Sequence, residues 1–177
     1  MLENDETAIY RSDVATPLGV FRLAATDRGL CALLLPRSSD EVWLKHMGPH
    51  RILEDARHPV LRQAAAELQS YLRGELQQFG VPLDLRGTPF QLQVWGALQQ
   101  IPYGETRTYG QVAAQVGNPR GVRAVGMANN RNPVAVIVPC HRVIGANGSL
   151  VGYGGGLPLK EHLLVLERSG LALAAGQ

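Results

Sequence analysis

The chain has 177 residues, enough for one domain or two small ones with apolar cores. Its content of 45% hydrophobic and 18% charged residues is ordinary for a globular protein, and no apolar run approaches the roughly 18 residues that a membrane helix needs. The acidic residues 1–6 lack the apolar region of a secretory signal, and two distant cysteines make no disulfide framework. We therefore expect a cytoplasmic protein without membrane association.

Charge is distributed unevenly along the chain. Residues 1–86 carry 10 Lys and Arg against 12 Asp and Glu, whereas residues 87–177 carry 7 against 3. Residues 88–157 hold a single acid, Glu105, and five arginines: Arg107, Arg120, Arg123, Arg131 and Arg142. Such an excess favours a polyanionic partner for the second half, although an ordinary solvated surface has the same composition.

The first half predicts a small α/β domain. Short apolar stretches between turn-forming Gly, Pro and Asp residues indicate strands at 8–14, 18–26 and 29–35. A helix with one apolar stripe begins at Pro59 and ends at Gly74.

A domain boundary is expected beside Arg86 and Gly87. The charge balance changes sign there, and Leu83 to Leu85 are a candidate last strand of the first domain. We therefore predict domains at 1–86 and 87–177.

The second half begins with helices. Thr88 is a candidate cap for a helix that opens with Pro89, and Thr108 with Gln111 predicts a capping box. The second of these helices runs from Tyr109 to about Val116, and after a turn at 117–119 another runs from about Arg120 to Asn130. This pattern is typical of a helix-turn-helix, although many such helix pairs bind nothing.

The helix at 120–130 is rich in small residues around Arg123, namely Gly121, Ala124, Gly126 and Ala128. Glycine lowers helix propensity, so its presence needs a reason. Tight packing against another helix is one explanation. We favour close approach to DNA in the minor groove, with Arg123 as the long side chain that enters the base stack.

The run Val138-Pro139-Cys140-His141-Arg142-Val143 places a cysteine beside a histidine. A thiol is nucleophilic as the thiolate, which a neighbouring imidazole or arginine favours. The alternative is that Cys140 is a small buried apolar residue at the end of a strand.

Several motifs together resemble the O6-alkylguanine-DNA alkyltransferases, also called methylated-DNA–protein-cysteine methyltransferases. They are IPYGETRTYG at 101–110, Arg123 to Gly126, Asn132-Pro133 and the PCHRV run at 139–143. The resemblance is strong over residues 82–170 and holds only in outline before them. It implies an α/β ribonuclease-H-like N-terminal domain and a mainly α winged-helix (helix-turn-helix) C-terminal domain. It also implies double-stranded DNA containing O6-alkylguanine as partner, no cofactor, and a monomer that binds DNA with possible cooperativity.

The resemblance also implies roles for individual residues. Cys140 would accept the alkyl group, His141 would act as its base through a water, and Glu167 would orient the histidine. Asn132 would tie the recognition helix to the cysteine segment. Further residues would contact DNA: Arg123 as the finger that replaces the flipped base, Tyr109 at a phosphate, and Ala124, Gly126 and Arg142. The pocket for the base would be formed by Tyr153, Gly154, Gly155 and Val143.

A thioether is inert and no second cysteine lies near Cys140 in the sequence, so we expect one turnover per molecule. Some members of the family carry a structural zinc. Here Cys31 is accompanied only by scattered His46, His50 and His58, so no metal site is expected. Gly154 stands where relatives often have Ser or Ala. The missing side chain either widens the pocket or weakens a contact to the flipped base.

Functions of other classes remain as alternatives. A non-catalytic alkylation sensor would lack the cysteine that is present as Cys140, and a fused repair regulator would need a further cysteine-rich domain. A plain winged-helix DNA-binding module remains if Cys140 is inert. A cysteine hydrolase is disfavoured because no oxyanion arrangement is recognisable.

Overall fold

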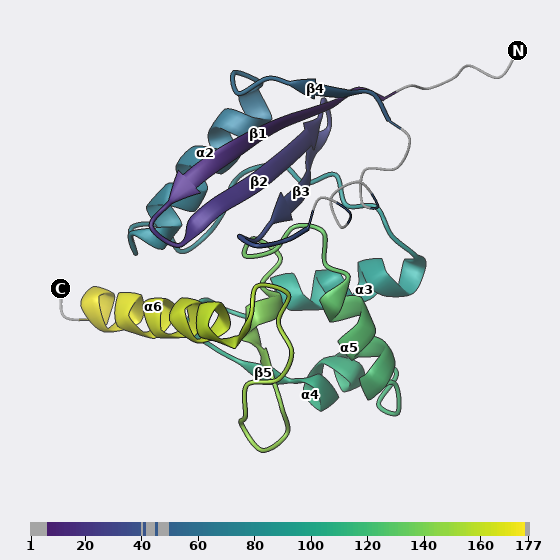
Figure 1. Ribbon diagram of the computed structural model, residues 1–177. Helices are drawn as coiled ribbons and strands as arrows, with labels where there is room; N and C mark the ends of the chain where they lie inside the picture. Colours follow the sequence, from purple (N-terminus) through teal and green to yellow (C-terminus); the bar gives the residue numbers. More distant parts are fainter. Residues whose placement is uncertain (1–6, 40, 42–44, 46–49, 176–177) are drawn as a thin grey trace, which may run out of the picture.

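A computed structural model describes residues 7–39, 41, 45 and 50–175 and shows an N-terminal sheet domain followed by a C-terminal helical domain (Figure 1). Residues 1–6 and His46, which entered the expectations about a signal and a metal, lie outside the described part. No helix in the described part is both long and apolar enough to cross a membrane.

The N-terminal domain is a four-stranded sheet with one helix against it. Its strands are arranged in the order β3-β2-β1-β4, with antiparallel pairs except that β4 runs parallel to β1. The elements are β1 (Ile9–Thr16), β2 (Gly19–Thr26), β3 (Gly29–Leu34), β4 (Ile52–Glu54) and α2 (Pro59–Leu72). The three predicted strands and the helix are confirmed. The expected strand at 83–85 is reduced to a single bridge between Leu30 and Leu83.

The C-terminal domain contains four helices and a short parallel pair of strands. The elements are α3 (Pro89–Gln99), β5 (Arg107–Thr108), α4 (Tyr109–Gln115), α5 (Val122–Asn130), the 3-10 helix η1 (Cys140–Arg142), β6 (Val143–Ile144) and α6 (Leu157–Ala175). The predicted capping box at Thr108 is present, and the predicted cap Thr88 forms a second one: each threonine accepts the backbone N–H three residues on, while Gln91 and Gln111 reach back. These local signals confirm α3 and α4.

The two domains share backbone hydrogen bonds. On the edge of β3, Leu33 donates its N–H to the Pro133 carbonyl at 2.9 Å and accepts from the Ala135 N–H at 3.1 Å. One apolar core then continues from the sheet into the helical domain. The segment that leads to Cys140 is therefore held by the N-terminal domain.

The chain turns sharply between this contact and Cys140. Val136 has a φ of +72°, and Ile137 donates its N–H to the Ala135 carbonyl at 2.9 Å, which together make a γ-turn. This left-handed backbone is costly for a β-branched residue, but the buried Val136 side chain holds it in place. The turn directs the following residues into η1, where Cys140 lies at the beginning of a helical turn, not at the end of a strand.

Candidate active site

Cys140 opens η1 and is only 5% exposed. Burial raises the pKa of its thiol, while a hydrogen bond from Asn132 and the charge of Lys160 oppose that rise without cancelling it. The expectation that adjacent His141 and Arg142 favour a thiolate is therefore wrong for the free protein. In this state the group is a neutral thiol, and its proton needs an acceptor before the sulfur can attack.

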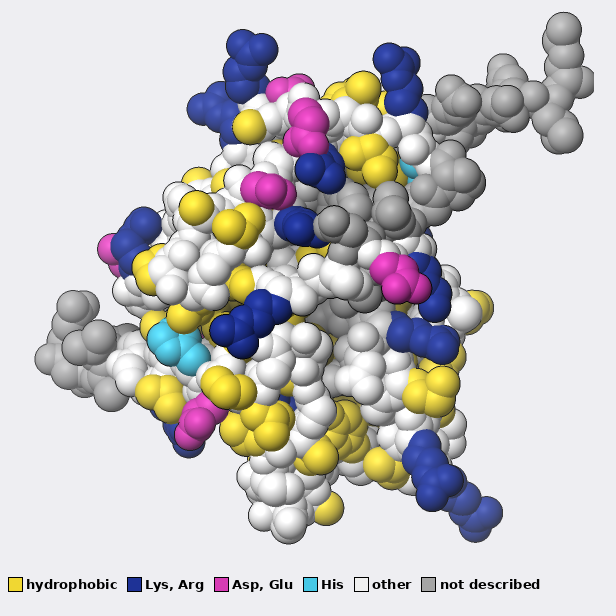
Figure 2. Space-filling view, viewed as in Figure 1, with side chains coloured by type: hydrophobic (Ala, Val, Ile, Leu, Met, Phe, Trp, Pro, Cys, Tyr) yellow, Lys and Arg dark blue, Asp and Glu magenta, His cyan; other side chains and the backbone are white. Residues whose placement is uncertain are grey.

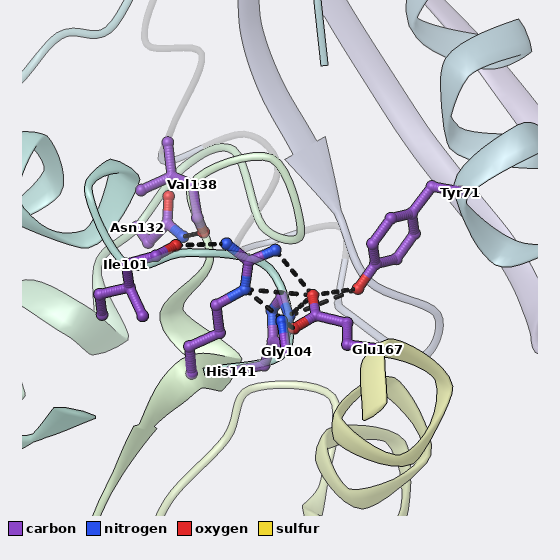
Figure 3. Close-up of polar contacts among 8 residues, drawn as sticks. Tyr71, Ile101, Gly104, Asn132, Val138, His141 and Glu167 are labelled. Carbon is purple, nitrogen blue, oxygen red and sulfur yellow. Dashed lines mark hydrogen bonds and ion pairs between the residues drawn. The ribbon is translucent and has the colours of Figure 1, made fainter. Parts of the chain in front are cut away.

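His141 is completely buried next to that thiol in the sequence. Its Nε2 lies 2.8 Å from Glu167 Oε1, and its Nδ1 has no hydrogen-bond partner among the described residues (Figure 3). Burial lowers the pKa of the imidazole more than Glu167 raises it, so the ring is neutral. Because an ionised carboxylate only accepts, the hydrogen bond assigns the proton to Nε2 and leaves Nδ1 as a base.

Glu167 is fully buried in the middle of α6 and gathers donors from several elements. Its Oε2 accepts the Gly104 N–H at 3.1 Å, and its Oε1 accepts the Tyr71 hydroxyl at 2.7 Å. Burial by itself raises the pKa of this carboxyl, but hydrogen bonds from His141 and Arg142, together with the charge of Arg142, lower it to about 2. Glu167 is therefore a permanent carboxylate, as the predicted orienting role requires.

Arg142 is buried, and the expectation that it contacts DNA is wrong. Only 7% of the residue is exposed. Its Nε and Nη2 donate to Glu167 at 2.9 and 2.8 Å, and its Nη1 donates to the Ile101 carbonyl at 2.6 Å. A charge next to a cysteine suggested a surface role, whereas the guanidinium neutralises the buried carboxylate of Glu167.

Asn132 connects the end of α5 to the cysteine segment, as predicted. Its Nδ2 donates to the Val138 carbonyl at 2.7 Å, and its Oδ1 accepts the Val134 N–H at 3.0 Å. Both bonds fix the backbone on the two sides of the γ-turn. Asn132 thus links the residues after α5 to the segment that carries Cys140.

Lys160 belongs to this cluster, although nothing in the sequence pattern singled it out. Its buried Nζ donates to the Val143 carbonyl at 2.6 Å and to the Val151 carbonyl at 3.0 Å. Burial lowers the pKa of this amine, and the neighbouring Cys140 opposes that change. Lys160 thus holds the 145–156 loop against β6.

The residues predicted to line a base pocket are only partly brought together. The hydroxyl of Tyr153 is buried without a partner among the described residues, and burial, with the charges of Cys140 and Glu167, raises its pKa well above the ordinary value. A side chain at Gly154 would meet nothing within 4 Å. In contrast, a Cβ at Gly155 would lie 2.6 Å from Leu159 and 3.0 Å from Leu35.

Gly155 therefore packs between α6 and the residue that follows β3, where there is no room for a side chain. The Val143 side chain is fully buried in the apolar core. The pocket roles of both residues stay predictions. The observations that agree with a pocket are the orphaned hydroxyl of Tyr153 and the open space at Gly154.

The opposite faces of α5 explain its small residues. Ala128 is buried against α3, and its carbonyl accepts the Trp95 indole N–H at 2.9 Å. Ala124 is exposed, and Gly126 is half-buried 4.0 Å from the Tyr109 ring, as measured from a Cβ built on that glycine. Small residues thus serve helix packing on one face and leave the outer face shallow around the exposed Arg123.

Exposed cations gather near this outer face. Of the five arginines, Arg107 pairs with Glu105 at 2.9 Å, and Arg142 is buried. The remaining three are exposed and make no ion pair within the described ranges: Arg120, Arg123 and Arg131. Figure 2 shows Lys and Arg side chains projecting beside α4 and α5, at the lower right. Tyr109 lies at the start of α4, and its hydroxyl donates to the Val151 carbonyl at 3.3 Å.

The described residues contain no group of three or more His, Cys, Asp or Glu side chains that could hold a metal ion. Both cysteines are free. The cluster around Cys140 thus has the parts of an alkyl acceptor: a buried thiol, a neutral imidazole with a free nitrogen, and a carboxylate that orients it.

Two family models match the chain. The model described as 6-O-methylguanine DNA methyltransferase, ribonuclease-like domain, matches residues 9–85. The model described as 6-O-methylguanine DNA methyltransferase, DNA binding domain, matches residues 89–169.

Individual proteins agree with these matches. A methylated-DNA–protein-cysteine methyltransferase of Mycobacterium bovis is 61% identical over 161 residues, which are 91% of this chain and 93% of that protein. One from Methanosarcina acetivorans is 47% identical over 161 residues, 91% of this chain and 99% of that protein. The crystal structure of Mycobacterium tuberculosis OGT in complex with DNA has a TM-score of 0.80 and 44% identity, and the match covers 92% of this chain and 94% of that one.

Proposed function

Because the chain belongs to the methylated-DNA–protein-cysteine methyltransferase family, we propose that Cys140 is the residue that accepts the alkyl group. The substrate is O6-alkylguanine in double-stranded DNA and, less efficiently, O4-alkylthymine. The protein is a DNA repair methyltransferase with a DNA-binding domain. The observation that carries the assignment is the buried cluster next to Cys140. His141, the next residue in the chain, is held at Nε2 by Glu167 and has a free Nδ1.

In the proposed reaction the sulfur–carbon bond forms as the carbon–O6 bond breaks. The thiol proton passes through a water to His141 Nδ1, and the imidazolium is stabilised by Glu167. The leaving guanine receives a proton from Tyr153, whose hydroxyl is buried without a partner. Tyr153 recovers its proton from His141, so the thiol proton ends on guanine. The product thioether is inert, which makes the protein a single-turnover enzyme.

The damaged base has to leave the duplex to reach a buried sulfur. Extrusion costs a few kcal/mol, and less for a poorly paired base. Arg123, on the shallow face of α5, would fill the space left in the stack, while Ala124 and Gly126 allow the helix to approach. Tyr109 would press on a neighbouring phosphate. The exposure of Arg123, next to the exposed Arg120 and Arg131, supports these roles.

Finer structural labels belong to the same proposal. We infer that α4 and α5 are the helix-turn-helix of a winged-helix domain, and that the N-terminal sheet with α2 is a ribonuclease-H-like domain. The division between residues 86 and 87 falls between the two matched models.

Mass spectrometry tests the function directly. The protein is mixed with a duplex that contains one O6-methylguanine, and both the intact mass and the Cys140 peptide are measured. We expect one methylene of added mass on that peptide, one guanine restored per protein, and no transfer by Cys140→Ala. Intact DNA binding without any gain would instead indicate a damage sensor or a plain DNA-binding module. Several products per protein would contradict the single turnover.

A further inference from the structure

One residue of the cluster around His141 comes from the N-terminal domain. Tyr71 lies in the last turn of α2 and is fully buried. Its ring meets the Tyr103 ring edge-on, with centroids 6.2 Å apart and planes at 88°, and it packs at 5.3 Å against Phe79. These aromatic contacts fix the ring, so that its hydroxyl crosses from one domain to the other (Figure 3).

The Tyr71 hydroxyl touches both acid–base partners. It donates to Glu167 Oε1 at 2.7 Å, and its oxygen lies 3.4 Å from His141 Nε2. Burial and the charge of Glu167 raise the pKa of Tyr71 well above the ordinary value. The hydroxyl therefore keeps its proton at neutral pH and acts as a donor.

The single proton of Tyr71 constrains the histidine. When that proton is given to Glu167, the tyrosine oxygen presents only lone pairs to Nε2, which favours the tautomer that carries its proton there. Nδ1 is then left unprotonated, as a base requires. Without the hydroxyl, Nε2 keeps its bond to Glu167, but Glu167 loses one of its donors, so the basicity of His141 changes.

We propose that Tyr71 is a positioning residue for alkyl transfer, through which the N-terminal domain holds Glu167 and sets the basicity of His141. This inference rests on the proposed function, because it assigns His141 as the base. The charged and titratable groups that face His141 are Glu167 and Lys160 from α6, Arg142 from η1 and Tyr71 from α2. Only Tyr71 among them comes from the N-terminal domain.

Tyr71→Phe removes the hydroxyl and keeps the ring. We expect single-turnover methyl transfer to slow by about tenfold, the effect of one lost hydrogen bond to a charged group. Because Glu167 loses a donor and becomes a stronger partner for His141, the pKa of the imidazole rises. The acid limb of the pH–rate profile should move upward by about half a unit or more. Binding to undamaged DNA should not change.

Tyr103→Phe is the matched control. Tyr103 lies at the same domain interface and packs against Tyr71, but its buried hydroxyl has no hydrogen-bond partner in the described part of the chain. Removal of the Tyr103 hydroxyl should leave the acid limb of the pH–rate profile at the same pH as in the wild type. An acid limb that also stays in place in Tyr71→Phe overturns the proposal, whatever happens to the rate, because the hydroxyl would then have no influence on the ionisation of His141.

A second measurement separates this proposal from the function on which it rests. Nitrogen-15 chemical shifts of the His141 ring report its tautomer without any reaction. Followed over pH, the same shifts also report the pKa of the ring. We expect the proton of the neutral ring on Nε2 in all three proteins, because Glu167 accepts it in each, and a higher pKa of His141 in Tyr71→Phe than in the wild type and Tyr103→Phe. If the wild type transfers no methyl group and the pKa still differs, the function fails while the effect of Tyr71 on His141 stands. Identical titrations in all three proteins overturn the role of Tyr71.

Discussion

The ionisation of Glu167 links the candidate active site to the stability of the fold. Its carboxylate joins the last helix to the turn at Gly104, to Arg142 and to α2 through Tyr71. The folded-state pKa of about 2 lies below the ordinary value of 4.5. The stabilisation is therefore complete above about pH 4.5 and is lost as the pH falls toward 2.

Glu167→Gln should lower stability at neutral pH and flatten its dependence on acid. The amide leaves the buried Arg142 without a counter-charge, which costs about 3–5 kcal/mol. Urea denaturation at pH 7, 5 and 3 measures the effect, with the wild type losing more stability between pH 5 and 3 than the variant. Glu161→Gln, at an exposed position on the same helix, is the control that should behave like the wild type. Parallel acid dependences in all three proteins would contradict the prediction.

Among the elements, β3 has neighbours on both of its edges. Beside the pairing with β2, Leu30 donates its N–H to the Pro82 carbonyl at 2.8 Å, and Asp84 donates to the Leu30 carbonyl at 2.9 Å. This contact ties the linker between the domains to the sheet. It depends on the absence of a side chain at Gly29, where a Cβ would lie 2.7 Å from the backbone of Pro82 and Leu83.

Gly29→Ala should therefore destabilise the protein by about 1–3 kcal/mol, because backbone atoms cannot rotate out of the way as a side chain does. Gly96→Ala in the middle of α3 should have the opposite sign. No atom lies within 4 Å of a Cβ there, and alanine favours a helix over glycine by about 0.5–1 kcal/mol. Thermal melts of both variants measure the two effects. A loss of stability in Gly96→Ala, or none in Gly29→Ala, would contradict the packing that assigns the signs.

Local signals made most of the helices predictable. The capping boxes at Thr88 and Thr108 involve residues three positions apart, so the sequence contains the whole interaction. The strand β4 was missed because its three residues are paired only with β1, far away in the chain. The sequence predicts a last helix at 158–168 with Glu167 near its end, whereas α6 runs from Leu157 to Ala175 and holds Glu167 in its middle.

The candidate site was predictable only where a motif carried it. The resemblance named Cys140, His141, Asn132 and Glu167, and the geometry brings these four together. Tyr71 was missed because an apolar stripe of a helix does not reveal which hydroxyl will cross a domain interface. Arg142 was misplaced because a charge near a nucleophile looks the same in a sequence whether it is exposed or paired.

At the scale of the whole molecule, the two domains are joined by several kinds of contact. The apolar core is continuous, and backbone hydrogen bonds, the Tyr71 hydroxyl and the packing of Gly155 on Leu35 all cross between the halves. Separate unfolding of either half would expose the shared apolar surface, and loss of the N-terminal half would remove the Tyr71 donor from the buried carboxylate of Glu167.

We therefore expect a single cooperative unfolding transition. Differential scanning calorimetry should give one peak whose calorimetric and van't Hoff enthalpies agree. Tryptophan fluorescence, which is dominated in the C-terminal domain by the buried Trp95, should follow the same curve as the far-ultraviolet circular dichroism of both domains. Two resolved peaks, or curves that do not coincide, would show that the shared contacts are too weak to couple the halves.

The contact between β3 and residues 133–135 also bears on the stage of synthesis at which the proposed acceptor site forms. Its partners are roughly a hundred residues apart in the chain. A ribosome releases the sheet long before the residues that join its edge, since domains emerge from the N-terminal side first. Only after synthesis has passed Asn132 and α6 do the thiol, its base and the orienting carboxylate meet. A partly made chain that still lacks α6 therefore carries Cys140 and His141 without the carboxylate that orients the proposed base.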